Sequence, residues 1–519
     1  MPSYAAIHGT PSEHGSRPTS QASHGSRRRH PKQVGMAGSA SWTSSVINLV
    51  NTIVGAGVLA MPHALSNMGI TLGTIVILWA GLTAGFGLYL QTRCARYLDR
   101  GASSFFALSQ ITYPNAAVVF DAAIAIKCFG VGVSYLIIIG DLMPGVVRGF
   151  GDVGDALYLL DRRFWVTAFM LIVIPLSFLR KLDSLKYTSV IALVSIAYLV
   201  VLVVYHYASG DTLPERGDIN WVQWQGAIPT LASFPIIVFA YTCHQNMFSI
   251  LNEIANNTPL RTTAVVGASI GSAASIYILV AITGYLSFGT NIMGNIVAQY
   301  TPSVFSTIGR AAIVVLVMFS YPLQVHPCRA SVDAVSKWRP QGRSKNNEEF
   351  TPASGSPTRS SLLSSGNGGG SQKVPSRPKP EDMSELRFAV ITTAIIILSY
   401  IVAMTVSSLD KVLAYVGSTG STSISFILPG LFYYKISSPD SPHHQRLLKD
   451  EDDEDYEGSG EDEDAGSPVA RGRKPWTSRI RGRQWQRDVL RKLSLALAIY
   501  GLVVMVVCLV INTFFIVAH

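Results

Sequence analysis

Residues 44–62 read SSVINLVNTIVGAGVLAMP, an apolar stretch in which two asparagines precede a Gly-Ala-Gly step and a proline. Two glycines this close together weaken a helix by about 2 kcal/mol relative to alanine. A membrane helix interrupted in this way frees backbone amides that can point at an anion and carbonyls that can point at a cation. A zwitterionic amino acid offers both charges. The alternative interpretation is that Gly55 and Gly57 form a close helix-packing face, which is common in membranes.

A second interrupted apolar stretch occurs five spans later. It contains Pro229 and Pro235, followed by the sequence FAYTCHQN at residues 239–246, the densest polar cluster within any span. Because five is an odd number, the two interrupted helices run in opposite directions across the bilayer, as repeats of inverted topology require. We therefore predict that the two breaks together form a binding site.

The whole chain has the composition of a membrane protein. Of its 519 residues 48% are hydrophobic and only 14% are charged, whereas a soluble protein has about 25% charged residues, and the mean hydropathy is +0.32. Its apolar stretches approach the ~20 residues that a membrane helix needs. They predict an all-α polytopic membrane protein with eleven transmembrane helices, at 43–66, 70–92, 116–140, 164–180, 187–208, 228–251, 263–288, 303–326, 386–409, 411–435 and 493–517.

Three polar segments separate or precede these spans, and we expect all three to be disordered and cytosolic. No apolar stretch follows Arg27–Arg29 closely enough to make a cleavable signal peptide, so we expect the N-terminal tail to be retained. The predicted organisation is a tail at 1–41, helices one to eight at 42–329, a linker at 330–385, helices nine and ten at 386–437, an acidic-then-basic loop at 438–491, and helix eleven at 492–519.

The Lys and Arg residues predict the orientation, because cytoplasmic flanks retain positive charge during insertion. With the N-terminus inside and eleven spans, 34 of the 41 basic residues fall on the inner side and five on the outer side. The remaining two, Lys127 and Arg310, lie within spans and are expected to face the bundle interior. This count predicts a cytosolic N-terminus and a C-terminus on the other side of the membrane.

Ionisable groups inside spans are candidates for function, because charging them in hydrocarbon is costly. His244 lies in the second interrupted helix, where it could carry a proton or bind substrate; alternatively, it is a neutral histidine that donates to a nearby carbonyl. Asp121 and His326 are the next candidates for proton coupling, although His326 near the end of its span suits interfacial packing as well.

Other chemistry finds little support in the sequence. Residues 415–430 are rich in small and hydroxylated side chains, which fit either tight helix packing or a polar path. No Walker motif, metal-ligand cluster or catalytic triad stands out, so we expect neither an enzyme nor an ATP-driven pump, with no cofactor and no nucleic-acid partner.

Four segments together resemble the amino acid/auxin permease family, and most of all its fungal vacuolar amino acid transporters. They are residues 48–62, 239–244, 321–329 and 423–434, and the resemblance covers the membrane part of the chain. It implies a five-plus-five inverted repeat with broken helices one and six, plus one extra helix. It also implies alternating access and proton-coupled movement of amino acids, often across a vacuolar or lysosomal membrane.

The resemblance also assigns roles to the two breaks. Residues 52–57 and 240–244 would be unwound and would hold the α-carboxylate and α-amino groups of the substrate. The candidate substrate-binding residues are Asn51, Thr52, Gly55, Ala56, Gly57, Ala240, Tyr241, Thr242 and His244.

The sequence thus favours a proton-driven amino acid transporter in the membrane of an acidic organelle such as the vacuole, with amino acids, protons and the lipid bilayer as partners. Two alternatives stay open. One is a sodium-coupled plasma-membrane permease, in which Asn51, Thr52 and Ser320 would ligate Na⁺. The other is a non-transporting amino acid sensor whose long inner loops recruit a soluble partner.

Overall fold

The computed structural model describes residues 38–151, 154–180, 188–337, 383–448 and 476–514. These belong to the second of two compact units, residues 36–519. Within the described ranges the regular structure is helical, apart from one isolated bridge between Ala40 and Ile254. The helices that build the membrane part are α1 (Trp42–Ile53), α2 (Gly57–Ser66), α3 (Ile70–Ala95), α5 (Ala117–Phe150), α6 (Arg162–Ser177), α7 (Thr188–Ser209), α8 (Ala227–Ala240), α9 (His244–Glu253), α10 (Pro259–Phe288), α12 (Val304–Lys337), α13 (Glu385–Thr405), α14 (Leu409–Val416), α15 (Leu428–Ile436) and α17 (Trp476–Phe514).

The number of membrane crossings follows from helix length and hydropathy. In the described part of the chain, eight helical segments are long and apolar enough to cross a membrane, and the bent pair α1 and α2 makes a ninth. Two further segments fall short of this test: α6 has 16 residues, and two π-helical turns at Gly417–Ser421 and Ser423–Ile427 join α14 to α15. The predicted all-helical membrane fold is confirmed, whereas the count of eleven spans requires that these two segments also cross.

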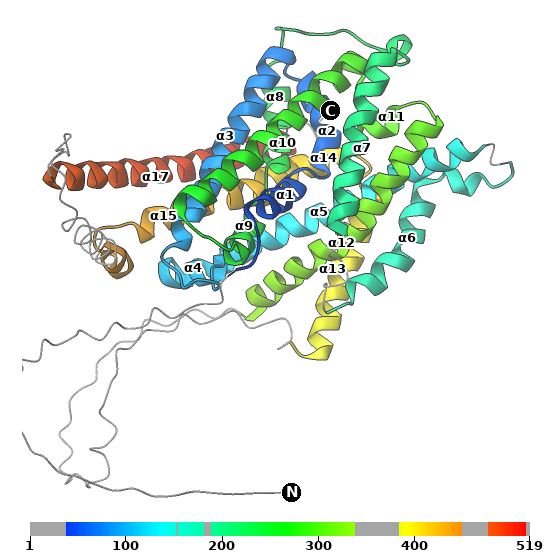
Figure 1. The fold of residues 1–519 in the computed structure, drawn as a ribbon. Helices are drawn as coiled ribbons and strands as arrows, with labels where there is room; N and C mark the ends of the chain where they lie inside the picture. The colour runs from blue at the N-terminus through cyan, green and yellow to red at the C-terminus, as the bar shows by residue number, and fades with distance from the viewer. Residues whose placement is uncertain (1–37, 152–153, 181–187, 338–382, 449–475, 515–519) are drawn as a thin grey trace, which may run out of the picture. The chain divides into compact units, whose positions relative to one another are not determined.

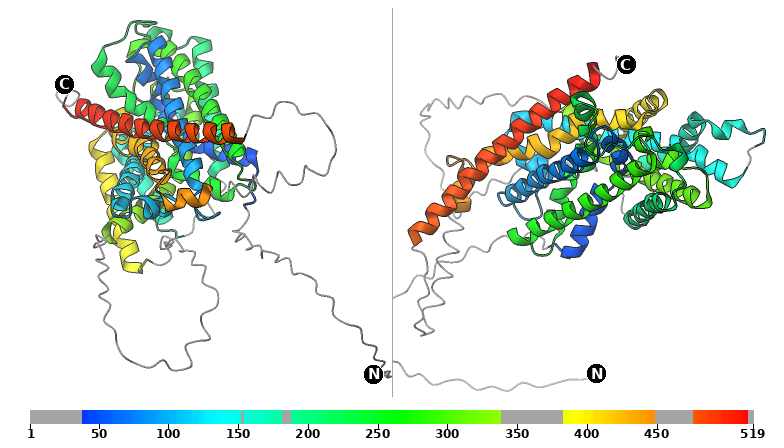
Figure 2. Two further views of the ribbon diagram at one scale, coloured as in Figure 1. Left: turned by 90° about the vertical axis from the view of Figure 1, so that its left-hand side faces the viewer. Right: turned by 90° about the horizontal axis from the view of Figure 1, so that it is seen from above.

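Small residues allow the helices to approach closely. In the ribbon of Figure 1, α12 packs along α5, and α10 packs against α2 and α3. A Cβ atom on Gly130 would lie 2.0 Å from Val416 Cγ2, and one on Gly417 would lie 2.0 Å from the carbonyl oxygen of Pro235. The long helix α17 runs beside α15 (Figure 2). At Gly417 the stretch 415–430 therefore serves helix packing, the first of its two interpretations.

Two long helices extend beyond the predicted spans. Helix α5 continues to Phe150 through residues expected in a loop, because Asp141 is paired with Arg162 at 3.1 Å and so need not face water. Helix α12 continues to Lys337, and Lys337 Nζ lies 2.8 Å from Asp333 Oδ2 one turn earlier. Ion pairs of this spacing favour a helix over a loop.

The prediction of disorder for the polar segments is wrong at their edges. Residues 330–337, 442–448 and 476–491 are helical, the last because α17 begins at Trp476 and runs without interruption into the apolar span. Extending an existing helix costs far less than nucleating a new one. The predictions for residues 1–37, 338–382 and 449–475 lie outside the described residues.

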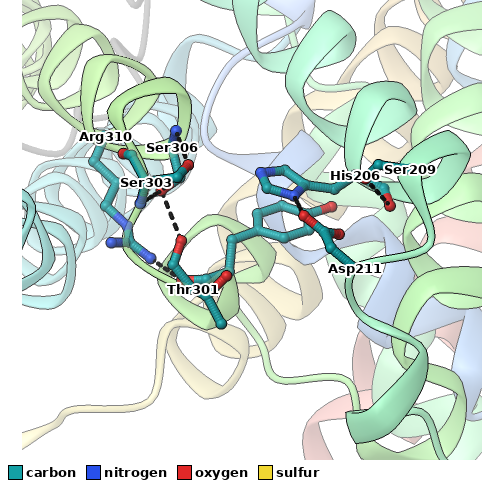
Figure 3. Close-up of polar contacts among 8 residues, drawn as sticks. His206, Ser209, Asp211, Thr301, Ser303, Ser306 and Arg310 are labelled. Carbon is teal, nitrogen blue, oxygen red and sulfur yellow. Dashed lines mark hydrogen bonds and ion pairs between the residues drawn. The ribbon is translucent and has the colours of Figure 1, made fainter.

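Arg310 stabilises the segment that connects α11 (Ile296–Gln299) to α12, as Figure 3 shows. Its guanidinium donates to the carbonyl oxygens of Val297 at 3.1 Å and Gly145 at 3.3 Å, and also to that of Tyr300. The ring of Tyr300 stacks on His206 with centroids 4.2 Å apart, and His206 Nδ1 lies 2.6 Å from Asp211 Oδ2. The buried cation within this span is therefore structural.

Replacing Arg310 by methionine is expected to lower the melting temperature of the purified protein. Each buried carbonyl left without its donor costs about 1–3 kcal/mol. Tryptophan fluorescence during heating in detergent measures the effect, with Arg310→Lys as the control that keeps the charge but not the fork of donors. An unchanged melting temperature for the methionine variant would contradict this role.

Candidate functional site

The first apolar span is broken between α1 and α2, as predicted. Helix α1 begins after Ser41, whose hydroxyl accepts a hydrogen bond from the Ser44 amide at 3.1 Å. It ends at Ile53, α2 begins at Gly57, and the two axes differ by 57°. Among the hydrogen bonds of the described residues, none uses the N–H of residues 55–57 as donor. The break therefore presents three free amides at the N-terminus of α2, where the helix dipole favours an anion.

The sixth span is broken at the corresponding place. Helix α8 ends at Ala240 and α9 begins at His244, so residues 241–243 are the non-helical ones. The two breaks touch, because a Cβ atom on Gly57 would lie 2.6 Å from Ala240 Cβ. Gly57 thus allows close helix packing, which is the alternative interpretation that the sequence offered for Gly55 and Gly57. Gly55 has no neighbouring atom within 4 Å of such a Cβ and borders open space.

Tyr277 of α10 joins the two breaks. Its hydroxyl lies 2.7 Å from the carbonyl oxygen of Ile53 and 2.7 Å from that of Ala240, the last residues of α1 and α8. Because a hydroxyl carries a single proton, it satisfies one carbonyl at a time and leaves the other to a ligand. A tyrosine in an apolar span carries no local signal, so this role could not be predicted from the sequence.

For the amino acid ligand that the resemblance implies, replacing Tyr277 by phenylalanine is expected to weaken binding about tenfold. The ends of α1 and α8 lose the group that holds them together, and a lost hydrogen bond of this kind costs about 1–1.5 kcal/mol. Equilibrium binding of labelled amino acid to the purified variant tests this. The control is Tyr285→Phe, which removes a hydroxyl from the same helix that binds the Asn220 amide at 2.8 Å. Equal affinity in the Tyr277 variant and the wild type would rule out the role.

A cavity of about 310 Å³ lies where the broken helices meet α5, α7 and α12. Asn48 and Asn246 line it and are exposed, so it opens toward the end where α1 starts and α9 ends. The lining residues are Asn48, Asn51, Thr52, Ile53, Val54, Gly55, Ala56, Gly57, Lys127, Val131, Tyr135, Ala192, Ile196, Phe239, Ala240, Thr242, Gln245, Asn246, Leu316, Val317, Ser320, Leu323, Gln324 and Pro327.

The cavity holds unused hydrogen-bonding groups. Asn51 Oδ1 and Gln245 Oε1 are buried and accept no hydrogen bond from the described residues. Thr52 and Asn246 link the two broken helices through a bond of 3.2 Å from Asn246 Nδ2 to Thr52 Oγ1. The two side-chain oxygens can accept hydrogen bonds from an ammonium group. The three free backbone N–H groups of residues 55–57 can donate to a carboxylate.

The structure brings seven of the nine predicted substrate residues to this cavity: Asn51, Thr52, Gly55, Ala56, Gly57, Ala240 and Thr242. It does not bring Tyr241 or His244 there. The Tyr241 ring packs edge-on against Tyr277 with centroids 5.1 Å apart. The buried His244 ring instead faces α3, where Nε2 donates to the carbonyl oxygen of Ala84 at 3.1 Å, while Nδ1 is buried without a partner.

The other two candidates for proton coupling are not part of the cavity lining. Asp121 is buried on α5 and His326 is half-buried on α12, and neither belongs to the lining. The sequence reasoning missed Gln245 and Gln324, which line the cavity. Gln245 follows His244 in the same polar cluster, so only its position in the helix, and not its type, distinguishes it.

Two broken helices that meet at a cavity are an arrangement found in many membrane transporters. A family model described as transmembrane amino acid transporter protein matches residues 38–451. The chain belongs to this family. It is 39% identical over 480 residues to vacuolar amino acid transporter 5 of Schizosaccharomyces pombe, covering 92% of this chain and 95% of that one. It is 44% identical over 408 residues to vacuolar amino acid transporter 6 of Saccharomyces cerevisiae, covering 76% and 90%.

Solved structures share the fold at low sequence identity. The structure of MhsT in complex with L-phenylalanine superposes with a TM-score of 0.51 at 12% identity, over 91% of this chain and 100% of that one. Mhp1, a nucleobase-cation-symport-1 family transporter, gives a TM-score of 0.50 at 10% identity, over 92% of each chain. At these identities the similarity concerns the fold alone.

Proposed function

We propose that this protein is a secondary active transporter that moves amino acids across a vacuolar membrane by alternating access. One observation carries the proposal: the free amides of one broken helix and the unpartnered side-chain oxygens beside the other face a common cavity. The relatives named as vacuolar amino acid transporters, similar over most of their length, support both the substrate and the membrane.

The two breaks suit the two charges that amino acids share. The α-carboxylate would accept hydrogen bonds from the amides of residues 55–57 at the start of α2. The α-ammonium would donate to Asn51 Oδ1 and to Gln245 Oε1. It would also donate to a backbone carbonyl, either that of Ile53 or that of Ala240, whichever does not accept the Tyr277 hydroxyl proton. Apolar side chains such as Val131, Ile196 and Leu316 contribute about half of the remaining wall, as is common in a small-molecule site.

Alternating access needs a second state in which this opening closes and the opposite side opens. The bridge between Ala40 and Ile254 joins the segment before α1 to the end of α9, with bonds of 2.9 and 3.0 Å. The half-helices α1 and α9 flank the mouth at Asn48 and Asn246. We infer that they move as a pair, so that an eleven-helix, five-plus-five arrangement exposes the site alternately to each side.

For the driving ion we favour the proton, with His244 as its carrier. Its Nδ1 can accept a proton without breaking the bond from Nε2 to Ala84. The new N–H would find no acceptor where the ring now lies, so protonation would favour a rearrangement of α9. Na⁺ is the competing ion, with Asn51, Thr52 and Ser320 all on the cavity wall.

Uptake into proteoliposomes tests the proposal and separates the two ions. Vesicles containing the purified protein are given either an inward pH gradient or an inward Na⁺ gradient, and the accumulation of labelled amino acid is measured. We expect accumulation with the pH gradient alone. Accumulation only with the Na⁺ gradient would show that Na⁺, and not the proton, is the driving ion. Absence of both uptake and exchange for every amino acid tested would refute transport.

We further propose that the N-terminus faces the cytosol and the C-terminus the lumen, on the basis of the distribution of 34 inner and five outer basic residues. A protease site inserted after Gly369 is then expected to be cut from the cytosolic side of intact vacuoles. A site inserted after Gly210, between α7 and α8, is expected to be protected. The reverse pattern would invert the topology.

A further inference from the structure

A single basic side chain, that of Lys127, lies in the wall of the cavity. Lys127 belongs to α5, is only 4% exposed and is one of the lining residues. Gly420 packs closely against the base of this side chain, since a Cβ atom there would lie 2.7 Å from Lys127 Cβ. Among the described residues its ammonium group makes neither a hydrogen bond nor an ion pair.

The cavity contains nothing to balance this charge. The other polar groups in its wall are amides and hydroxyls, and none of the lining residues is Asp or Glu. On the same helix, Asp121 is not part of the lining, and Asp141 is paired with Arg162 at 3.1 Å. A buried cation without a partner is costly, and such groups are paired or ligand-bound in native proteins.

A zwitterion alone cannot supply the missing charge. Its α-carboxylate is provided for by the free amides of residues 55–57, and its α-ammonium by the side-chain oxygens of Asn51 and Gln245. With both ends bound in this way, a neutral amino acid leaves the ammonium of Lys127 unpaired. A second carboxylate on the substrate side chain would pair with it, whereas a cationic side chain would be repelled.

We propose that Lys127 is the specificity-determining residue of this site, and that it binds the side-chain carboxylate of an acidic amino acid such as glutamate or aspartate. The proposal rests on the transport function proposed above and names its substrate class. It also predicts discrimination against lysine and arginine as substrates.

Glutamate and glutamine provide a test, because they have nearly the same shape and differ in side-chain charge. The full-length protein in proteoliposomes exchanges labelled glutamine in the presence of unlabelled glutamate, glutamine or lysine as competitor. For the wild type we expect half-maximal competition by glutamate at a concentration at least about tenfold lower than by glutamine. This is the ratio expected for a hydrogen bond to a charged group. Lysine should compete least well.

Two variants complete the experiment. Lys127→Met keeps the length of the side chain without its charge and should bring the glutamate-to-glutamine ratio to about one, because competition by glutamate weakens about tenfold more than competition by glutamine. Lys127→Arg keeps the charge and should retain a preference for glutamate. An unchanged ratio in the methionine variant, or an equal loss of glutamate and glutamine, would overturn the assignment.

The wild type alone suffices should the variants fail to fold. Lysine competing as well as glutamate in the wild type would overturn the selectivity of Lys127 while amino acid transport stands. If the wild type exchanges no amino acid at all, the function proposed above fails, and the assignment of Lys127 fails with it.

Discussion

Replacing Gly55 by valine is expected to abolish amino acid binding while the protein remains folded. A side chain at this position meets no atom within 4 Å and so causes no clash, but it occupies the space in front of the free amides at the start of α2. Valine also disfavours the broken backbone conformation, because its branched side chain restricts the backbone far more than glycine does. Without access to the amides, the substrate α-carboxylate loses its binding partner.

Thermal stabilisation by added amino acid measures this effect, since a ligand that binds the folded state raises its stability. The wild type should be stabilised and the Gly55→Val variant should not. Gly267 of α10 offers a matched control, because it too has no atom within 4 Å of an added Cβ but lies away from the cavity. If Gly55→Val is still stabilised by amino acid, the break serves packing alone.

The second large effect concerns His244→Gln, which should abolish accumulation of amino acid driven by a pH gradient while exchange at equal pH persists. The glutamine Nε2 can still donate to the carbonyl oxygen of Ala84, as His244 Nε2 does at 3.1 Å. It has no counterpart of the histidine Nδ1, which is buried without a partner and can take up a proton. Substrate binding therefore survives and coupling does not.

Uptake by proteoliposomes with and without a pH gradient separates these two properties. The control is His206→Gln, at a histidine outside the cavity lining whose Nδ1 pairs with Asp211 at 2.6 Å. If the His244 variant still concentrates amino acid, the proton takes another route. Asp121→Asn and His326→Gln would then be the next variants to measure.

The sequence predicts the positions of the two breaks to within about two residues, because glycine, proline and polar side chains act locally on helix formation. It could not separate Gly55 from Gly57. Gly57 touches Ala240, 183 positions along the chain, whereas Gly55 faces the cavity, and only the packing of α2 against α8 decides which is which. The packing interpretation thus holds for Gly57, and substrate binding at Gly55 stays a prediction.

The orientation of side chains at the second break lay beyond the sequence for the same reason. His244 and Gln245 are neighbours in one polar cluster, yet the first faces α3 and the second faces the cavity. A helix rotates by about 100° per residue, so the exact residue at which α9 begins decides which side chain meets the substrate. Lys127, in turn, was expected to face the bundle interior and does so, but the cavity that gives it a role arises from helices far apart in sequence.

Counterflow of labelled amino acids tests most directly whether the cavity between the breaks is a transport site. Proteoliposomes that contain the purified full-length protein are loaded with an unlabelled amino acid mixture and diluted into buffer with a trace of labelled amino acid. We expect the label to accumulate transiently inside vesicles with the wild-type protein, and not inside vesicles with Gly55→Val. Binding of amino acid without any counterflow would contradict the account and would instead favour a sensor that does not transport.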